Sequence, residues 1–464
     1  MIEEDIRNQP VAEAFSPEEA DLATTGGRRK PRRPHSAAAN ALDEISRPRK
    51  SDKYIWAVFI TLCVISIIEQ YSASSREIAA SNVLGPILRH CAMLGMGAAV
   101  AVLVSRVPYK WFIPLTPVFV LISFLAMVYV LFNGQIINGA RRSFNLVGIQ
   151  VQPAELIKLS SVLIIAFIMS RGKNMSNMKI GVCVAIVLVF GGLLFSQGLT
   201  NTILMMCISS SMMLIGGIKW KQFAVVILVY AIAGGGAMLY KAANDDHDAH
   251  TERLITETGR DAEGNEATIN RVGLWKARLD RFLDNDTTPK YRRAINDQNR
   301  QEMHAYMAQA NGGIFGVMPG NSRETARLPL ANIDFVYSIV IEDLGLIGGL
   351  FLLLVYLSLL GRAGAIAMGC HRVFPALLIL GMAVYIVLQA LCHMAIVTGA
   401  GPVSGQPLPM ISKGGTSILV TSLAFGIMLS VSRFAVRKGK KQDIAREAAE
   451  LPDDMQAANP TMLK

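Results

Sequence analysis

The sequence predicts an all-α integral membrane protein with ten transmembrane helices and one large extracytoplasmic loop between the seventh and the eighth helix. Of its 464 residues, 52% are hydrophobic and only 17% are charged, and the mean hydropathy is +0.38. This composition is too apolar for a soluble globular protein of this size. The apolar residues gather in runs of about 20, the length that a helix needs to cross the hydrocarbon core.

The ten apolar runs follow one another closely, except before the eighth. They cover residues 54–72, 84–105, 111–133, 153–170, 180–196, 199–218, 222–240, 335–360, 374–397 and 414–431. Only Gln197 and Gly198 separate the fifth run from the sixth, so either a short turn or a broken helix fits this boundary.

Basic residues set the orientation of the predicted helices. They fall on alternate connections: Arg106, Lys110, Arg171, Lys173, Lys179, Lys219, Lys221, Arg362 and Arg372. An even number of spans places the two tails, residues 1–53 and 435–464, on the same side as these loops. By the positive-inside rule both tails are cytoplasmic. We expect the first tail to be disordered, because it is polar and rich in Pro, Ala and Arg.

Other classes of protein fit the sequence less well. The six cysteines lie in apolar runs or in the short loop before Phe374, so we expect no disulfide framework. The net charge of +10 is spread over loops and tails, which is typical of membrane topology rather than of nucleic-acid binding. We expect no cleavable signal, because no apolar core precedes Tyr54.

The outer loop, residues 241–334, is longer than a connection requires, and such loops are functional or disordered. Residues 247–267 are predicted to be flexible. Residues 274–283 and 291–310 carry apolar side chains at near-helical spacing and are predicted to form amphipathic helices on the membrane surface. The stretch before Asp334 is expected to be a flexible approach, because it contains Gly312, Gly313, Gly316 and Gly320.

Asp334 stands where the polar outer loop gives way to the eighth apolar run. An ionised carboxylate at the edge of the hydrocarbon is costly, and it is kept where it faces water, a cation or a substrate. We therefore interpret Asp334 as the chemical centre of a membrane enzyme. The alternative is that Asp334 only caps the helix that begins at Phe335, since Asp accepts hydrogen bonds from the first free N–H groups.

Two further charged pairs lie on the outer side. Arg141 and Arg142 occupy a short outer loop, against the positive-inside trend. A bound anion would explain them, because guanidinium groups suit diphosphate or carboxylate; snorkelling of two long cations is the alternative. Glu155 and Lys158 stand at i and i+3 on one helix face, where an internal ion pair is the favoured interpretation.

Residues 398–417 are dense in Gly and Pro and lie between two apolar runs. Non-helical backbone at membrane depth is tolerated only where it is buried in protein or lines a wet cavity. We favour a cavity wall or re-entrant segment over a plain tight loop. Lys413 in this stretch could contact an anion there, or could snorkel to the interface.

In order, the motifs NGARRSF, QPAELIKL, LPLANIDFVYSIVIEDLG and GPVSGQPLPMISKGGTS resemble the SEDS family (shape, elongation, division and sporulation) of FtsW and RodA type. The resemblance covers residues 54–433. It implies a peptidoglycan glycosyltransferase that polymerises lipid II, the undecaprenyl-pyrophosphate disaccharide-pentapeptide, at the outer face of the bacterial cytoplasmic membrane. It also implies that Asp334 takes the place of the family's essential aspartate, and that Arg141 and Lys158 match basic positions of its motifs.

Within the family, the long basic N-terminal tail and the segment GGIFGVMPGNSRETARLP resemble division-type FtsW more than elongation-type RodA. We therefore expect a role in cell division, at the septum. The sequence departs from the family pattern after Gln197, where an expected second acid is absent, and at Asp343, His393 and Lys413. These departures leave the expected reaction class unchanged, but they put any family role of those positions in doubt.

The implied reaction needs a base for the attacking sugar hydroxyl and positive charge for the leaving diphosphate. We expect Asp334 to be the base, or to hold a divalent cation (Mg or Mn) that lowers the pKa of the hydroxyl. Glu155 is the reserve candidate for orientation or metal contact. The residues expected to bind the diphosphate are Arg141, Arg142, Lys158 and Lys413.

The resemblance implies a class B penicillin-binding transpeptidase as partner, together with other division proteins and membrane lipid, and no nucleic acid. Two other classes stay open. A transporter or flippase would also have ten spans with intramembrane charges and broken segments, and a scaffold would only position division partners. The two halves of the sequence show no convincing self-similarity, and a carrier has no evident use for so large an outer loop.

Overall fold

The computed structural model describes residues 50–73, 85–137, 140–146, 149–172, 176–244, 282–283, 294–296, 299–325, 327–328, 333–436 and 441–459. The chain divides into two units, Met1–Pro48 and Arg49–Lys464, and every described residue belongs to the second. The predictions for the N-terminal tail up to residue 49, for residues 247–267 and for residues 274–281 lie outside the described residues.

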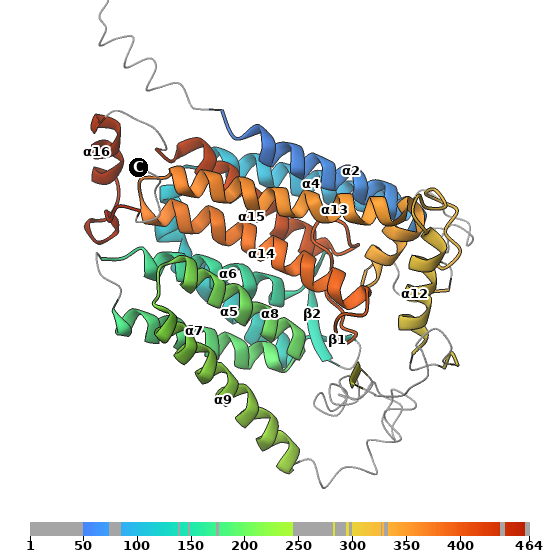
Figure 1. Cartoon of the computed structure of the whole chain (residues 1–464). Helices are drawn as coiled ribbons and strands as arrows, with labels where there is room; N and C mark the ends of the chain where they lie inside the picture. The colour runs from blue at the N-terminus through green and yellow to red at the C-terminus, as the bar shows by residue number, and fades with distance from the viewer. Residues whose placement is uncertain are drawn as a thin grey trace, which may run out of the picture. The chain divides into compact units, whose positions relative to one another are not determined.

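Each of the ten apolar runs contains a helix (Figure 1). The helices are α2 (Lys53–Ala73), α4 (Gly85–Arg106), α5 (Phe112–Asn133), α6 (Pro153–Met169), α7 (Asn177–Phe195), α8 (Leu199–Ile215), α9 (Trp220–Asn244), α13 (Val336–Gly369), α14 (Val373–Val397) and α15 (Gly415–Phe434). Among the described residues, seven of them are long and apolar enough to cross a membrane, and α8 and the first part of α9 are shorter apolar helices. The helical membrane fold is confirmed, and the count of ten spans stays a prediction.

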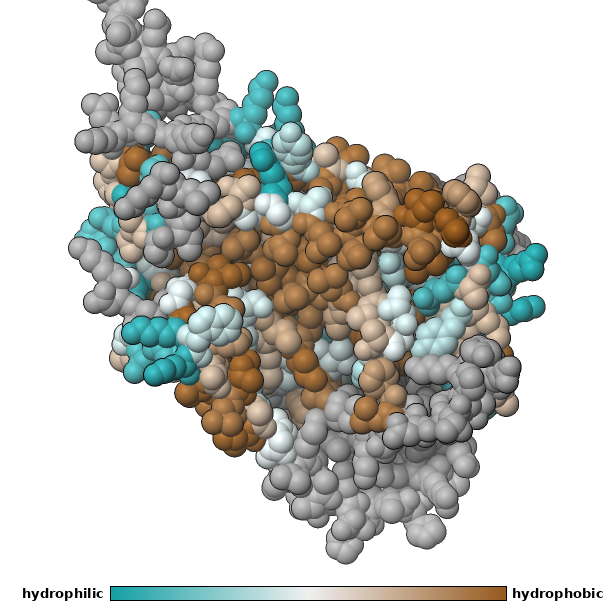
Figure 2. Space-filling model, in the orientation of Figure 1, coloured by the Kyte–Doolittle hydropathy of each residue, from teal (hydrophilic) through white to brown (hydrophobic). Residues whose placement is uncertain are grey.

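The surface has the distribution of side chains that a membrane protein requires. Large hydrophobic side chains are exposed along α2, α5 and α13, for example Ile60, Leu121 and Leu354. Figure 2 shows hydrophobic residues covering the middle of one face, with hydrophilic residues gathered toward its two ends. So large an exposed hydrophobic surface would be unfavourable in water. Its position between two polar ends matches a hydrocarbon layer bounded by two polar interfaces.

The centre of the fold is α14, which packs against α6, α8, α13 and α15. In the most apolar stretch of each helix, 83% of the residues of α14 and α15 are buried inside the protein, but only 22% of those of α4 and α5. A helix that is apolar on every side is expected in the core of a large bundle or facing lipid. Residues at or just before the starts of α6, α13 and α15 come together at one end of the bundle, where they line a common cavity.

The connection between α5 and α6 is a small antiparallel sheet of strand order β1-β2-β3, which the all-α prediction did not include. Its strands are β1 (Gln135–Ile137), β2 (Ala140–Leu146) and β3 (Ile149–Val151). The motif NGARRSF was expected to be a short loop. A sheet forms because backbone N–H and C=O groups held against the bundle must be paired, and strand pairing satisfies them within the segment. Phe144 packs edge-on against Tyr129 of α5, which holds β2 on the helix.

In the outer loop, α12 (Arg300–Gly312) overlaps the second predicted amphipathic helix, residues 291–310, and packs against α13. The glycine-rich stretch after α12 forms backbone hydrogen bonds with α13. The amide nitrogens of Val317 and Met318 lie 2.9 and 3.0 Å from the carbonyl oxygens of Glu342 and Asp343, and that of Leu346 lies 3.0 Å from the carbonyl oxygen of Gly313. Residues 313–318 are therefore attached to α13 rather than forming the flexible approach that was predicted, because the glycines permit close backbone contact.

The described part of the C-terminal tail, residues 441–459, is called the C-terminal segment below. It contains α16 (Lys441–Ala449) and η4 (Asp453–Met455). Glu447 accepts a hydrogen bond of 2.7 Å from the Tyr109 hydroxyl, and Asp454 pairs with Arg171 at 2.9 Å. The Asn459 amide donates two bonds of 3.0 Å to carbonyls at the end of α13. These contacts join the connections that carry basic residues, at the end of the bundle away from β1 and β2 (Figure 1).

Candidate active-site cavity

A polar cavity of about 180 Å³ lies among the helix starts that come together at this end of the bundle. Its walls come from β2 and β3, the start of α6, the turn between α7 and α8, the residues before α13, and the Gly- and Pro-rich loop leading into α15. The lining residues are Arg142, Gln150, Gln152, Ala154, Glu155, Gln197, Asn201, Ile333, Asp334, Gly405, Pro407, Lys413, Gly414, Gly415, Thr416 and Ser417. Four of the six predicted site residues are thus brought to one cavity, and Arg141 and Lys158 are not among its lining.

Asp334 lies on the cavity wall, just before α13. Helix α13 begins at Val336 and its N-cap residue is Phe335, so Asp334 is not the capping residue that the alternative interpretation requires. The backbone of Gly405 passes close to the carboxylate: a Cβ built at this glycine would lie 3.1 Å from Asp334 Oδ2. Glycine at this position therefore leaves room for the carboxylate to face the cavity.

The two neighbouring arginines have different roles because they lie on a strand. Successive side chains of a strand point to opposite faces. Arg142 lines the cavity, whereas the guanidinium of Arg141 donates to the carbonyl oxygens of Leu131 and Phe132 at the end of α5. Of the two arginines that were expected to bind an anion, only Arg142 lines the cavity.

Glu155 and Lys158 form an ion pair of 2.7 Å in the first turns of α6, which begins with Pro153 as predicted. Lys158 is fully buried beneath Glu155, and its ammonium also donates to Gln389 at 3.1 Å. Tyr385 donates to the other Glu155 oxygen at 2.9 Å. Each partner is thus compensated, as a buried charge must be. Glu155 lines the cavity, and Lys158 supports it from behind.

The Gly- and Pro-rich loop forms a wall of the cavity, as predicted, and Lys413 is part of that wall. Side chains of α14 hold this loop by its carbonyl groups. His393 Nδ1 donates to the Gln406 carbonyl at 2.6 Å, and Gln389 donates to the Pro407 carbonyl at 3.3 Å. The Gln406 side chain donates to Asn201 at 3.0 Å, which connects the loop to α8.

Several lining residues were not singled out by the sequence as site residues, namely Gln150, Gln152, Gln197, Asn201, Thr416 and Ser417. Thr416 accepts from the Gln152 amide nitrogen at 3.1 Å and donates to the Gln150 carbonyl, so it fixes β3 against the start of α15. The one signal available for Gln197 was its position beside Gly198 in the break between two apolar runs. Amides and hydroxyls are common in loops, and their spacing alone does not mark a cavity.

The cavity combines one carboxylate at the helix start, a second carboxylate held by a lysine and a tyrosine, and two cations from separate elements. This combination can accept a proton and bind an anionic group within the same space. Among the described residues, no group of three or more His, Cys, Asp and Glu side chains is arranged to hold a metal ion. Two carboxylates, Asp334 and Glu155, line the cavity, so the divalent cation expected at Asp334 stays a prediction, and no step below depends on a metal.

Comparison with known proteins agrees with this architecture. The family model for FtsW, RodA and SpoVE, described as cell cycle proteins, matches residues 50–437. The probable peptidoglycan glycosyltransferase FtsW of Bacillus subtilis is 26% identical over 401 residues, which cover 83% of this chain and 92% of that protein. The protein of the same name from Coxiella burnetii is 27% identical over 393 residues, covering 81% and 95%.

Two solved structures share the fold. A chain of a peptidoglycan synthase complex that coordinates polymerization and crosslinking superposes with a TM-score of 0.62 at 22% identity, covering 82% of this chain and 98% of that chain. The rod shape determining protein RodA of Thermus thermophilus gives a TM-score of 0.56 at 21% identity, covering 84% and 98%. The resemblance that the sequence motifs indicate is confirmed by the family match, and the chain belongs to the FtsW, RodA and SpoVE family of cell cycle proteins.

Proposed function

We infer that this protein is a peptidoglycan glycosyltransferase that polymerises lipid II into glycan strands during cell division. The observation that carries the inference is the single cavity that joins Asp334 with the cations Arg142 and Lys413. Relatives named peptidoglycan glycosyltransferase FtsW, similar over most of the chain, support it.

In the proposed reaction, the 4-hydroxyl oxygen of one lipid-linked sugar bonds to the anomeric carbon of another. The hydroxyl proton passes to the Asp334 carboxylate. The bond between the anomeric carbon and the oxygen of undecaprenyl pyrophosphate breaks, and the diphosphate leaves with the electron pair. A base within hydrogen-bond reach and preset positive charge at the leaving group are the two contributions that a protein can make to such a step.

The structure supports a revised assignment of the anion-binding residues. Arg142 and Lys413 line the cavity and are proposed to face the diphosphate. Lys158 is fully buried in its pair with Glu155, and Arg141 binds carbonyls at the end of α5. We therefore propose that Lys158 and Tyr385 hold Glu155 at the cavity wall, and that Glu155 orients the substrate.

The partners and location follow from the same proposal. A structural neighbour belongs to a peptidoglycan synthase complex, which supports pairing with a class B penicillin-binding transpeptidase. We propose a multi-pass protein of the bacterial cytoplasmic membrane, with both termini cytoplasmic and the cavity at the outer face, acting with other division proteins at the septum. A RodA-type role in elongation is the alternative, and the midcell or side-wall position of a fluorescent fusion distinguishes them.

The substitution Asp334→Asn tests the proposed base. In full-length protein purified with its transpeptidase partner and given lipid II, we expect polymerisation to fall by about 100-fold or more, since the loss of a general base costs about 10²–10⁴ in rate. Asp443→Asn, the same change on α16 at the other end of the bundle, is the matched control and should keep the wild-type rate.

Glycan product from wild-type protein identifies an enzyme. Movement of lipid across the membrane without product would instead indicate a carrier, and neither activity would indicate a scaffold. An Asp334→Asn protein that polymerises at the wild-type rate would show that this carboxylate is not the base.

A further inference from the structure

We propose that Glu342 is a positioning residue that holds the segment leading to Asp334, and that Ser412 fixes the other end of the same segment. This inference rests on the proposed function, because Asp334 is the group being positioned. Glu342 is not among the cavity-lining residues, so any effect of Glu342 on the reaction is indirect.

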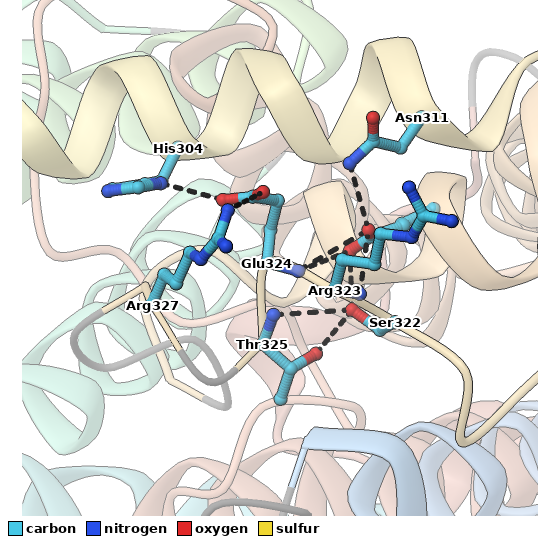
Figure 3. Close-up of polar contacts among 8 residues, drawn as sticks. His304, Asn311, Ser322, Arg323, Glu324, Thr325 and Arg327 are labelled. Atoms are coloured by element: carbon cyan, nitrogen blue, oxygen red, sulfur yellow. Dashed lines mark hydrogen bonds and ion pairs between the residues drawn. The ribbon is translucent and has the colours of Figure 1, made fainter.

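Glu342 is fully buried, two turns into α13. Its carboxylate accepts hydrogen bonds from the Asn311 side chain at 3.3 Å, from the Ser322 hydroxyl, and from the backbone N–H groups of Arg323 and Glu324 at 3.0 and 3.4 Å. Figure 3 shows these donors gathered from α12 and the following loop. An ionised carboxylate is an acceptor with about four lone-pair sites, so it suits a cluster made only of donors.

The loop after α12 is also attached to that helix through Glu324. Glu324 is buried and accepts from His304 of α12 at 2.6 Å, and it pairs with Arg327 at 3.3 Å (Figure 3). Within the turn, the Thr325 hydroxyl donates to Ser322 at 2.6 Å. Residues 322–325 are therefore attached to both α12 and α13, and they have little freedom to shift along either helix.

Ser412 provides the second attachment, immediately before Asp334. Its hydroxyl donates to the Ile333 carbonyl at 2.7 Å and accepts from the Leu408 N–H at 2.7 Å. Ser412 directly precedes Lys413 in the sequence. Its hydroxyl therefore links the residue before Asp334 to the loop that carries Lys413. The chain between residues 322 and 333 is thus held at both ends by groups outside the cavity.

Two acceptor oxygens on Glu342 are central to this arrangement. Glutamine has nearly the same shape, but it offers a single carbonyl oxygen and places an NH2 group against N–H donors. Buried donors that lose their acceptor are destabilised, so the loop should detach from α13 while the apolar packing of the helix stays unchanged. A displacement of about 1 Å at a reacting group can cost about 100-fold in rate.

The experiment compares Glu342→Gln with Glu302→Gln, the same substitution in the first turn of α12, in full-length protein with its transpeptidase partner. We expect Glu342→Gln to lower the kcat of lipid II polymerisation about 10- to 100-fold with the KM nearly unchanged. Trypsin should also cut faster after Arg323 and Arg327, because the loop carries both arginines. The Glu302→Gln protein should match the wild type in both measurements.

Two further variants keep the proposal testable if Glu342→Gln does not fold. Ser322→Ala removes one donor and should cause a smaller loss of kcat with faster cutting. Ser412→Ala should lower kcat without faster cutting after Arg323. Wild-type kcat and wild-type cutting in Glu342→Gln, or a change in KM alone, would overturn the proposal. Absence of glycan from the wild type would count against the proposed function instead, and the trypsin measurement would still test the attachment.

Discussion

Two adjacent residues of the same type, Arg141 and Arg142, have opposite surroundings in this protein. One binds the carbonyls that end α5 and the other lines the cavity. The difference comes from the two-residue repeat of a strand, in which Ile136 pairs with Arg141 and Ser143 pairs with Gln135. Sequence position alone assigns both arginines the same role, and the backbone conformation separates them.

Arg142→Ala should therefore lower activity, whereas Arg141→Ala should lower stability. Loss of Arg142 should reduce lipid II polymerisation by about 100-fold, the scale of losing a charge-stabilising group in an active site, with little change in thermal stability. Loss of Arg141 should lower the free energy of unfolding by about 1–2 kcal/mol, because it removes hydrogen bonds from a charged group, and should leave activity near the wild-type value. Kinetics and thermal unfolding in detergent measure both effects, and equal loss of activity in both variants would contradict the assignment.

The residues that could be found from sequence are those whose charge conflicts with their surroundings. Asp334 is conspicuous at the edge of an apolar run, and Glu155 and Lys158 at one helix face form the ion pair that their spacing predicts. Their depth could not be predicted, since residues three apart on a helix share a face but differ by about 4.5 Å along the axis. Gln197 and Asn201 line the cavity, but uncharged amides are common in turns and first helical turns, so their residue type carries no signal.

At the scale of elements, the break within α13 shapes the site end of the molecule. Gly345 has a φ of +72° inside the helix, and a Cβ at this position would lie 2.2 Å from the Ile314 carbonyl oxygen. Both the backbone conformation and the contact therefore require glycine. The turns before the break carry Glu342, and those after it continue as the long apolar helix.

Gly345→Ala should lower the free energy of unfolding by about 3 kcal/mol or more, because a strained backbone conformation costs about 1–3 kcal/mol and the steric contact adds to it. Polymerisation should fall as well, since the turns with Glu342 must move. Gly364→Ala on the same helix is the matched control: open space surrounds its Cβ position, and helix propensity should make it neutral or stabilising by up to about 1 kcal/mol. Thermal unfolding and kinetics of the two variants measure the difference, and equal stability would argue against a required break.

The helices themselves were predictable because a run of about 20 apolar residues has one stable conformation in lipid. The strands were not, since β2 contains two arginines and an asparagine and has no clean alternation of apolar and polar residues. Residues 313–318 were predicted to be flexible for a related reason, although they are hydrogen-bonded to α13. Glycine permits both mobility and close contact, and only the partner surface on α13 decides which of the two occurs.

At the scale of the whole molecule, the proposed orientation places α12 and the cavity outside and the C-terminal segment inside. Asn321→Cys and Asp443→Cys, introduced separately, test this in intact cells treated with a membrane-impermeant maleimide. We expect labelling of Asn321→Cys, which is exposed in the outer loop, and labelling of Asp443→Cys only after the membrane is opened. Wild-type protein serves as the blank for the six native cysteines, and the reverse pattern would invert the orientation.

The C-terminal segment bears on the choice between a polymerase and a carrier. A carrier must open alternately to both sides, which requires its helices to separate at each end in turn. Here one stretch of chain ties Tyr109, Arg171 and the last carbonyls of α13 together across the basic end. Separation of the helices at this end would break these contacts at once. The C-terminal segment therefore opposes opening at the basic end, which alternating access requires and polymerisation at one membrane face does not.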